Sequence, residues 1–199
     1  MNDEIVLEID DFLPQDHADY IEDALLKSRL FPWQFNDNTV SNEHNDDERN
    51  IPGFFNLIYD FQRPQKNEYF DLINPIALQM SSKTGLEFRE VIRIQANLIC
   101  PVNTEGHHLP HLDFFDHHYV AIYYVNDSDG DTYLFENTNK EYNLDYDVQI
   151  TKDRSTNWPV KKRITPKKGK LVLFNGYRYH SSSSPKQSNY RSLININIR

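Results

Sequence analysis

Histidine is concentrated in one short stretch of the sequence. Five of the eight histidines lie between Gly106 and Val125, and one of them begins the tripeptide His111-Leu112-Asp113. In an extended chain the side chains of residues i and i+2 point to the same side, so His111 and Asp113 can converge on one point. An imidazole and a carboxylate are two of the three ligands of the 2-His-1-carboxylate triad that binds Fe(II). The stretch therefore predicts a metal site that needs one more histidine.

His180 is the candidate for that third ligand. It follows Leu171 to Phe174, an apolar run typical of a buried strand, and a histidine just past such a strand can enter a cavity between two sheets. Arg191 begins a further alternating strand, where a guanidinium among core positions needs a partner such as a bidentately held carboxylate. The order of these parts along the chain favours one composite site over separate coincidences.

Each of these residues also has an ordinary explanation. A single His-x-Asp can arise by chance in a histidine-rich stretch, a lone histidine is usually structural, and a lone arginine usually forms a salt bridge. An adventitious site or a zinc site is an alternative, although no His-Glu-x-x-His helix supports a metalloprotease. We expect the other histidines of the stretch to be polar residues of a rim or of loops: His107, His108, His117 and His118.

The composition indicates one domain, 1–199, with a helical N-terminal support at about 1–89 and a β core at about 90–199. The chain carries 21 Lys and Arg against 30 Asp and Glu, a net charge of −9, which disfavours a nucleic-acid partner or an anionic membrane surface. Cys100 is the single cysteine, so no intramolecular disulfide can form. Without a signal-like N-terminus or a span-length apolar run, we expect a cytoplasmic protein.

Periodicity predicts helices first and strands afterwards. Apolar residues recur at helical spacing from Pro14 to about Ser28 and again from Glu68 to Lys83, with Gly85 as a C-cap and a long polar loop at 32–50 between them. In the strand that begins at Val91, the polar face contains Asn97, which can line a pocket or be solvated. Many short strands with polar turns suggest a sandwich or jelly roll. The expected strands are 5–9, 53–59, 91–99, 119–125, 132–136, a piece of 148–164, 171–174 and 191–198.

At these residues the sequence resembles the Fe(II)/2-oxoglutarate-dependent dioxygenases, and most of all their prolyl 4-hydroxylase-like branch. The family pattern is His-x-Asp, a distant His and then Arg or Lys, which is matched by His111, Asp113, His180 and Arg191. The segment 122–126 resembles the family's Tyr-Tyr-Leu-Asn strand, and 129–135 resembles its Gly-Gly-x-Leu-x-Phe strand with one glycine replaced. The likeness is strong over about 91–199 and loose before that.

The resemblance implies a mainly β, α+β chain: a double-stranded β-helix of the jelly-roll, cupin-like kind with N-terminal helices. It implies Fe(II) bound by the triad, 2-oxoglutarate and O2 as cosubstrates, ascorbate as a reductant, and release of succinate and CO2. Arg191 would hold the far carboxylate of 2-oxoglutarate with help from the Tyr124 hydroxyl, and Asn97 would line the same pocket.

The acceptor is left open between classes. The branch implies a hydroxylase of a peptidyl side chain, with prolyl as the first candidate, and the alternative acceptor is a free amino acid or another small molecule. A second arginine, six residues after the first, is typical of the nucleic-acid demethylase branch, and Asn197 occupies that position here. The rival function is a non-enzymatic jelly-roll binding or structural module, which would need neither iron nor Arg191.

Overall fold

The computed structural model describes residues 6–39, 51–63 and 66–199, and these form two sheets and four helical segments. The helical segments are α1 (Gln15–Glu22), the π-helical turn η1 (Asp23–Lys27) that continues it, α2 (Phe70–Thr84) and α3 (Leu144–Lys152). The strands are β1 (Val6–Ile9), β2 (Gln34–Asn36), β3 (Gly53–Asp60), β4 (Val91–Ile99), β5 (Tyr119–Tyr124), β6 (Thr132–Thr138), β7 (Val160–Ile164), β8 (Leu171–Asn175), β9 (Arg178–Ser182) and β10 (Arg191–Ile198).

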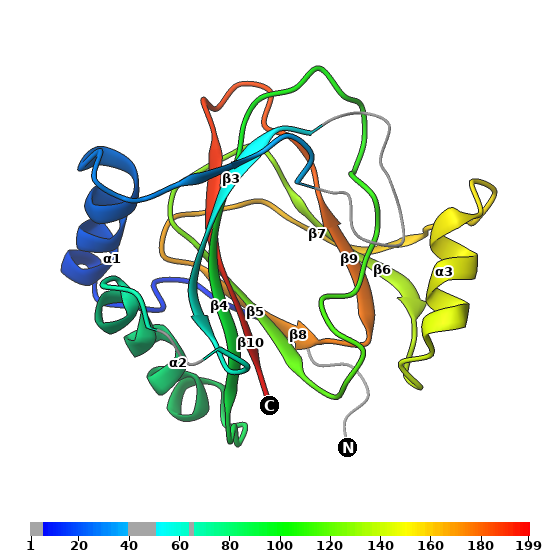
Figure 1. The fold of residues 1–199 in the computed structure, drawn as a ribbon, viewed down its shortest axis with the longest axis horizontal. Coiled ribbons are helices and arrows are strands. Elements are labelled where there is room, and N and C mark those ends of the chain that lie inside the picture. Colours follow the sequence, from blue (N-terminus) through cyan, green and yellow to red (C-terminus); the bar gives the residue numbers. More distant parts are fainter. Residues whose placement is uncertain (1–5, 40–50, 64–65) are drawn as a thin grey trace.

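Two antiparallel sheets face each other. The larger sheet has the strand order β1-β8-β5-β10-β4-β3-β2, and the smaller sheet has the order β7-β6-β9. Helices α1 and α2 cover the outer face of the larger sheet, while α3 lies beyond the smaller sheet (Figure 1). A mainly β chain with helices at its N-terminal end is what the sequence predicts.

Strand β5 shows why its sequence is apolar without interruption. Val120, Ile122 and Tyr124 pack into the cluster between the sheets. Ala121 and Tyr123 belong to the cluster that also contains buried residues of α1 and α2. Because both faces of the strand are buried, no position on it can be polar and exposed, so the alternation that marks a half-buried strand is lost.

Helix α2 matches its sequence pattern closely. It runs unbroken through Pro75 and ends at Gly85, whose φ of 73° is the left-handed conformation that glycine adopts without strain. Its buried side chains, Ile73, Ile76 and Met80 among them, recur at the spacing of one helix face. The helix therefore follows from periodicity and capping, and Pro75 does not split it.

The N-terminal part is more than helical support. Strand β1 pairs with β8, and β3 pairs with β4, so 1–89 contributes three strands to the larger sheet. The piece expected as a strand within 148–164 is divided between α3 and β7, because Asn143 accepts the Tyr146 N–H and begins a helix. Of the loop expected at 32–50, residues 34–36 form β2, and 40–50 lie outside the described residues.

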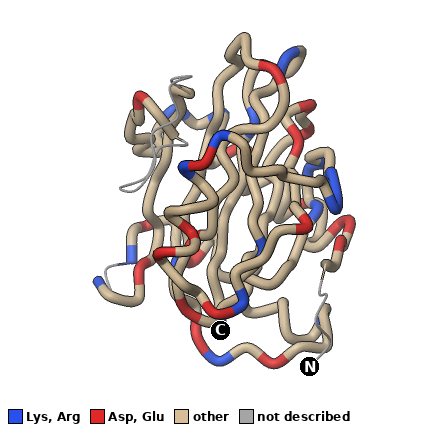
Figure 2. Tube along the Cα trace, turned by 90° about the vertical axis from the view of Figure 1, so that its right-hand side faces the viewer, with Lys and Arg blue, Asp and Glu red and all other residues tan. Residues whose placement is uncertain are grey.

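Charged residues of both signs are interspersed along the loops and edges seen in Figure 2. In the whole sequence, carboxylates outnumber basic groups, so the net charge is negative. Among the described helices, none has both the length and the apolar character needed to cross a bilayer.

Candidate metal centre

The two histidines of the predicted triad are brought together by backbone pairing. His180 lies within β9, and an isolated antiparallel bridge joins it to His111. The His111 N–H donates to the His180 carbonyl at 3.0 Å, and the His180 N–H donates to the His111 carbonyl at 3.1 Å. The sequence placed His180 just beyond a strand, but a two-residue turn after Asn175 starts a new strand in the other sheet.

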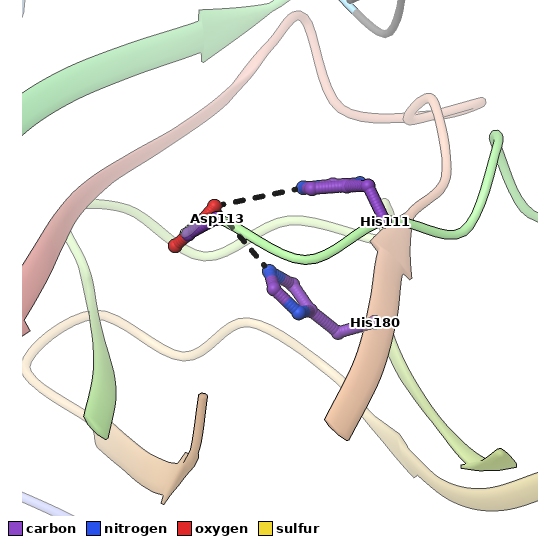
Figure 3. Close-up of side chains that lie close together, drawn as sticks. All are labelled: His111, Asp113 and His180. Carbon is purple, nitrogen blue, oxygen red and sulfur yellow. Dashed lines mark ion pairs between the residues drawn. The ribbon is translucent and has the colours of Figure 1, made fainter. Parts of the chain in front are cut away.

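The three side chains converge on one point. Figure 3 shows both imidazoles directed at the Asp113 carboxylate. The distance from Asp113 Oδ1 is 3.8 Å to His111 Nε2 and 3.7 Å to His180 Nε2. One ligand atom from each residue lies within 4.8 Å of the others, so the group could hold a metal ion. The geometry thus brings together the three residues that the sequence singled out.

Both imidazoles are oriented for Nε2 to act as the ligand atom. The Nδ1 of His180 lies 3.2 Å from the Arg178 carbonyl, and the Nδ1 of His111 lies 3.3 Å from the Leu109 carbonyl. A carbonyl oxygen only accepts, so Nδ1 must carry the proton and the Nε2 lone pair is free. Burial and the nearby His111 lower the pKa of His180 to about 4, which keeps its imidazole neutral near pH 7.

Asp113 is ionised although it is buried. Burial acts to raise the pKa of its carboxyl, but the nearby charge of Arg93 and a hydrogen bond from Asn197 act to lower it, and the pKa lies well below its usual range. The Arg93 guanidinium lies 3.5 Å from Asp113 Oδ1, and the amides of Asn195 and Asn197 donate to Oδ2. A carboxylate and the neutral imidazole of His180 are therefore available at near-neutral pH, with His111 Nε2 directed at the same point.

A cavity of about 230 Å³ extends from this group between the sheets. At about this volume the cavity is smaller than the roughly 300–1,000 Å³ of sites for drug-sized ligands, so it suits a small molecule. Arg191 also lines it. Only 2% of Arg191 is exposed, and one guanidinium nitrogen donates to Thr132 Oγ1 at 2.7 Å, while the buried Nε has no partner. Among the described residues no carboxylate forms an ion pair with Arg191.

The other two predicted residues differ in position. Asn97 lines the cavity, and its Oδ1 accepts from Gln95 Nε2 at 2.7 Å. Tyr124 is fully buried and is not among the lining residues, since its hydroxyl donates to Thr132 Oγ1 at 2.7 Å. Tyr124 therefore reaches Arg191 in two ways: directly, with its ring centre 5.8 Å from the guanidinium, and through Thr132, a residue that no motif in the sequence pointed out.

The remaining four histidines lie in loop segments, as expected, but two of them are buried. His108 is buried, with Ser182 Oγ 3.0 Å from its Nδ1 and Ser184 Oγ 3.0 Å from its Nε2. His118 is buried against Gly176, where any Cβ would overlap the imidazole ring. Both hold the loop segment to the sheets, whereas His107 is half-buried and His117 is exposed.

No protein-family model matches the sequence, and a search of characterised proteins found no match. Solved structures do match over almost the whole chain. A Pseudomonas putida prolyl-4-hydroxylase is 14% identical, with 98% of this chain and 91% of that chain covered and a TM-score of 0.53. The 2-oxoglutarate-dependent epimerase SnoN of nogalamycin biosynthesis is 13% identical, with 98% and 76% covered and a TM-score of 0.64.

A third match is a prolyl hydroxylase from Trichoplax adhaerens, solved with a peptide of hypoxia-inducible factor. It is 15% identical, with 97% of this chain and 82% of that chain covered and a TM-score of 0.61. Identities this low establish a shared architecture and leave the chemistry to be argued from the site itself. The chain therefore has the fold of the Fe(II)/2-oxoglutarate-dependent oxygenases, the prolyl hydroxylases among them, as its sequence motifs predict.

Proposed function

We propose that the protein is an Fe(II)- and 2-oxoglutarate-dependent oxygenase that hydroxylates its acceptor. The observation that carries the proposal is the pairing of two features in one cavity. His111, Asp113 and His180 present a facial ligand set, and the buried guanidinium of Arg191 lines the same space without a carboxylate partner among the described residues. A metal site alone would explain the first feature and would leave the second unexplained.

The residues present fit Fe(II). Two neutral imidazoles and one carboxylate form the facial triad of non-haem Fe(II) sites and leave other positions open. Ligand atoms bound to one ion at about 2.1 Å and at right angles lie about 3 Å apart. The observed separations of 3.7 and 3.8 Å are a little wider, so modest side-chain movement suffices.

Arg191 and Thr132 fit the far carboxylate of 2-oxoglutarate. A guanidinium can hold a carboxylate through two parallel hydrogen bonds, and burial strengthens such contacts because water does not compete. Thr132 Oγ1 already accepts from both Arg191 and Tyr124, so its own hydrogen is left to donate elsewhere. The hydroxyl hydrogen of Thr132 is not donated to any described residue. A ligand carboxylate in the cavity would accept a hydrogen bond from this hydroxyl.

These positions indicate which parts of the reaction belong to the metal and cosubstrate and which belong to the chain's own residues. When bound, Fe(II) would supply the oxidising chemistry, in which O2 is the oxidant: one of its oxygen atoms would go to succinate as 2-oxoglutarate loses CO2, and the other to the acceptor. The chain's own residues would orient the cosubstrate between the triad and Arg191, and they hold Asp113 ionised. Asn97 lies on the wall between these two ends and is proposed as a further cosubstrate contact.

We infer that the two sheets form a double-stranded β-helix of the jelly-roll kind. For the acceptor, a peptidyl side chain such as prolyl is the first proposal, and a free amino acid or other small molecule is the second. The similar structures include examples of both, a hydroxylase solved with a peptide and an epimerase of a biosynthetic route. A cytoplasmic location and ascorbate as reductant belong to the same proposal.

The test is an anaerobic visible spectrum. Adding Fe(II) and then 2-oxoglutarate to the protein should produce the weak charge-transfer band of the chelated cosubstrate. The matched controls are His111→Ala, which removes a ligand, and His117→Ala, which removes an exposed histidine of the same segment. The band should be lost in the first variant and kept in the second. A wild-type protein without the band would support the rival, a binding or structural module.

A further inference from the structure

The two oxygens of the Asp113 carboxylate have different surroundings. Oδ1 lies 3.8 and 3.7 Å from the two histidine Nε2 atoms, on the side where a metal ion would bind, and it forms an ion pair with Arg93 at 3.5 Å without a hydrogen bond from an amide. Oδ2 accepts two hydrogen bonds, one from Asn195 Nδ2 at 3.0 Å and one from Asn197 Nδ2 at 2.7 Å. Two N–H donors occupy both lone pairs of a carboxylate oxygen, so Oδ2 has little capacity left for a metal.

Strand β10 supplies both amides because alternate residues of a strand share one face. Arg191, Asn195 and Asn197 therefore look toward the same space, and one strand carries both the Arg191 end and the Asp113 end of the cavity. Asn197 is fully buried. Its amide is held in one orientation, since Arg93 Nε donates to its Oδ1 at 3.1 Å and leaves Nδ2 to donate to Asp113.

We propose that Asn195 and Asn197 are positioning residues that restrict Asp113 to binding a metal through Oδ1 alone. This inference rests on the metal site of the proposed function. A carboxylate that bound through both oxygens would occupy two coordination positions and would leave only two of six beside the histidines. Single-oxygen binding leaves three, which a cosubstrate that chelates through two atoms needs if one position is to remain for the reaction.

The two asparagines are not equivalent. Asn197 uses both ends of its amide, whereas the buried Oδ1 of Asn195 has no partner among the described residues. Hydrogen bonds therefore fix both ends of the Asn197 amide, but only the Nδ2 end of the Asn195 amide. Loss of the Asn197 amide should disturb the carboxylate more than loss of the Asn195 amide.

Cobalt(II) is the probe for the test, because its visible absorption reports coordination number and it binds the same ligands as Fe(II). The variants are Asn195→Leu and Asn197→Leu, which keep side-chain size and remove the amide donors. Asn56→Leu is the control: Asn56 is a buried amide of the same sheet, and it hydrogen-bonds to the Pro32 carbonyl away from the cavity. Cobalt(II) affinity, the cobalt spectrum and 2-oxoglutarate affinity of the cobalt form are measured for each.

Loss of a residue that orients a metal ligand typically costs about 10- to 100-fold in metal affinity or activity. In Asn197→Leu we expect a loss on that scale, about 10- to 100-fold, to fall on 2-oxoglutarate affinity, because the cosubstrate needs the positions that a two-oxygen carboxylate would take. Cobalt(II) affinity should be kept or raised, and the spectrum should change before the cosubstrate is added. Asn195→Leu should show the same pattern to a smaller degree, and it remains a test if Asn197→Leu does not fold. Asn56→Leu should lower the melting temperature and leave all three readouts unchanged.

Two results would overturn the inference. One is an equal fall of cobalt(II) and 2-oxoglutarate affinity in Asn197→Leu, which would make the amides general supports of the site. The other is an unchanged spectrum and unchanged 2-oxoglutarate affinity in both variants. A wild-type protein that binds neither cobalt(II) nor 2-oxoglutarate would overturn the proposed function itself, which is a distinct result because it needs no variant.

Discussion

The two ends of the cavity satisfy their charges in opposite ways. At the metal end, Asp113 is surrounded by partners from the chain itself, namely Arg93 and the amides of Asn195 and Asn197. At the other end, Arg191 is 2% exposed and has Thr132 as its hydrogen-bond partner, with no ion-pair partner among the described residues. Strand β10 contributes residues to both ends. Its Asn195 and Asn197 bind a carboxylate of the chain, whereas its Arg191 has no carboxylate partner among the described residues.

This difference in charge partners suits the two ends of the cavity to different ligands. Burying a charge without a partner is costly, so a buried guanidinium is expected where a ligand completes it. The metal end has its three ligand atoms within 4.8 Å of one another, and contacts of the chain itself hold Asp113 there. We therefore expect metal binding to be independent of Arg191, and cosubstrate binding to depend on both ends. The following changes test that separation in order of expected effect.

The largest effect is expected from His180→Ala. The variant removes one of three metal ligands, and loss of a ligand should exceed the about 10- to 100-fold that loss of an orienting residue costs. Fe(II) affinity in an anaerobic titration should fall by more than about 100-fold on that basis, and 2-oxoglutarate turnover should vanish. His111→Ala should behave in the same way, because its Nε2 occupies the corresponding position.

The remaining histidines of the stretch are the controls for that prediction. His107→Ala and His117→Ala remove half-buried and exposed imidazoles and should retain turnover. His108→Ala and His118→Ala remove buried ones, so they should lower the melting temperature and yet leave Fe(II) affinity in the folded protein. If one of these four abolished Fe(II) binding while His111→Ala kept it, the ligand assignment would be wrong.

The next effect is expected from Asp113→Asn. The change removes the negative charge that a divalent ion needs, while Asp116→Asn removes an exposed carboxylate that pairs with Arg199. Exposed ion pairs contribute at most about 1 kcal/mol, and Asp116 is directed at Arg199 instead of the histidines. Fe(II) affinity should therefore fall at least about tenfold more in Asp113→Asn, on the scale of changes around metal ligands. Equal affinities would remove Asp113 from the site.

The metal end could be predicted from the sequence by residue type, and only partly by local structure. His111 and Asp113 are close in sequence, so a spacing rule finds them even though their segment is largely irregular and not a strand. His180 was found by its place after the apolar strand, although strand β9 itself was not predicted. The run Arg-Tyr-His-Ser-Ser of β9 is buried on both faces, so polar residues appear at core positions without any periodic signal.

The support of the site could not be predicted. Asn195 and Asn197 look like ordinary polar positions of an alternating strand, and their role depends on where a loop residue about eighty positions earlier comes to lie. Thr132 is a common strand residue, and its partners Tyr124 and Arg191 come from two other strands. Such contacts depend on sheet order, which a single sequence does not contain. The strand pairings of the described residues supply it.

Arg191 provides the sharpest test of the separation between the two ends. Arg191→Ala removes hydrogen bonds to a charged group, worth about 1.5–3 kcal/mol or roughly 10- to 150-fold in affinity. The KM for 2-oxoglutarate should rise at least about tenfold on that estimate. Fe(II) affinity without cosubstrate should stay within error. Arg191→Lys should fall between, since it keeps the charge and loses the planar fork.

A pair of titrations decides that prediction, Fe(II) alone and then 2-oxoglutarate onto the Fe(II) form. The expected independence of metal binding from Arg191 is contradicted if Arg191→Ala loses Fe(II) affinity, because the guanidinium would then support the metal end. The expected dependence of cosubstrate binding on both ends is contradicted if 2-oxoglutarate affinity is unchanged. In that case the buried charge would serve only its contact with Thr132 and the ring of Tyr124, whose centre lies 5.8 Å away.

The smallest effect is expected at Thr132, the residue that links Tyr124 to Arg191. Thr132→Val keeps the shape and removes the oxygen that accepts from both neighbours and has its own hydrogen to give. The ligand loses one hydrogen bond, worth about 0.5–1.5 kcal/mol, while the guanidinium of Arg191 remains in the cavity. The Kd for 2-oxoglutarate should therefore rise by about three- to tenfold, less than in Arg191→Ala. Tyr124→Phe removes a hydroxyl that donates to Thr132 and interacts with Arg191 but does not line the cavity, so it should weaken 2-oxoglutarate binding less than Thr132→Val does. A larger effect in Tyr124→Phe than in Thr132→Val would mean that the Tyr124 hydroxyl turns to contact the ligand directly, as the sequence resemblance implies, and that Thr132 is a bystander.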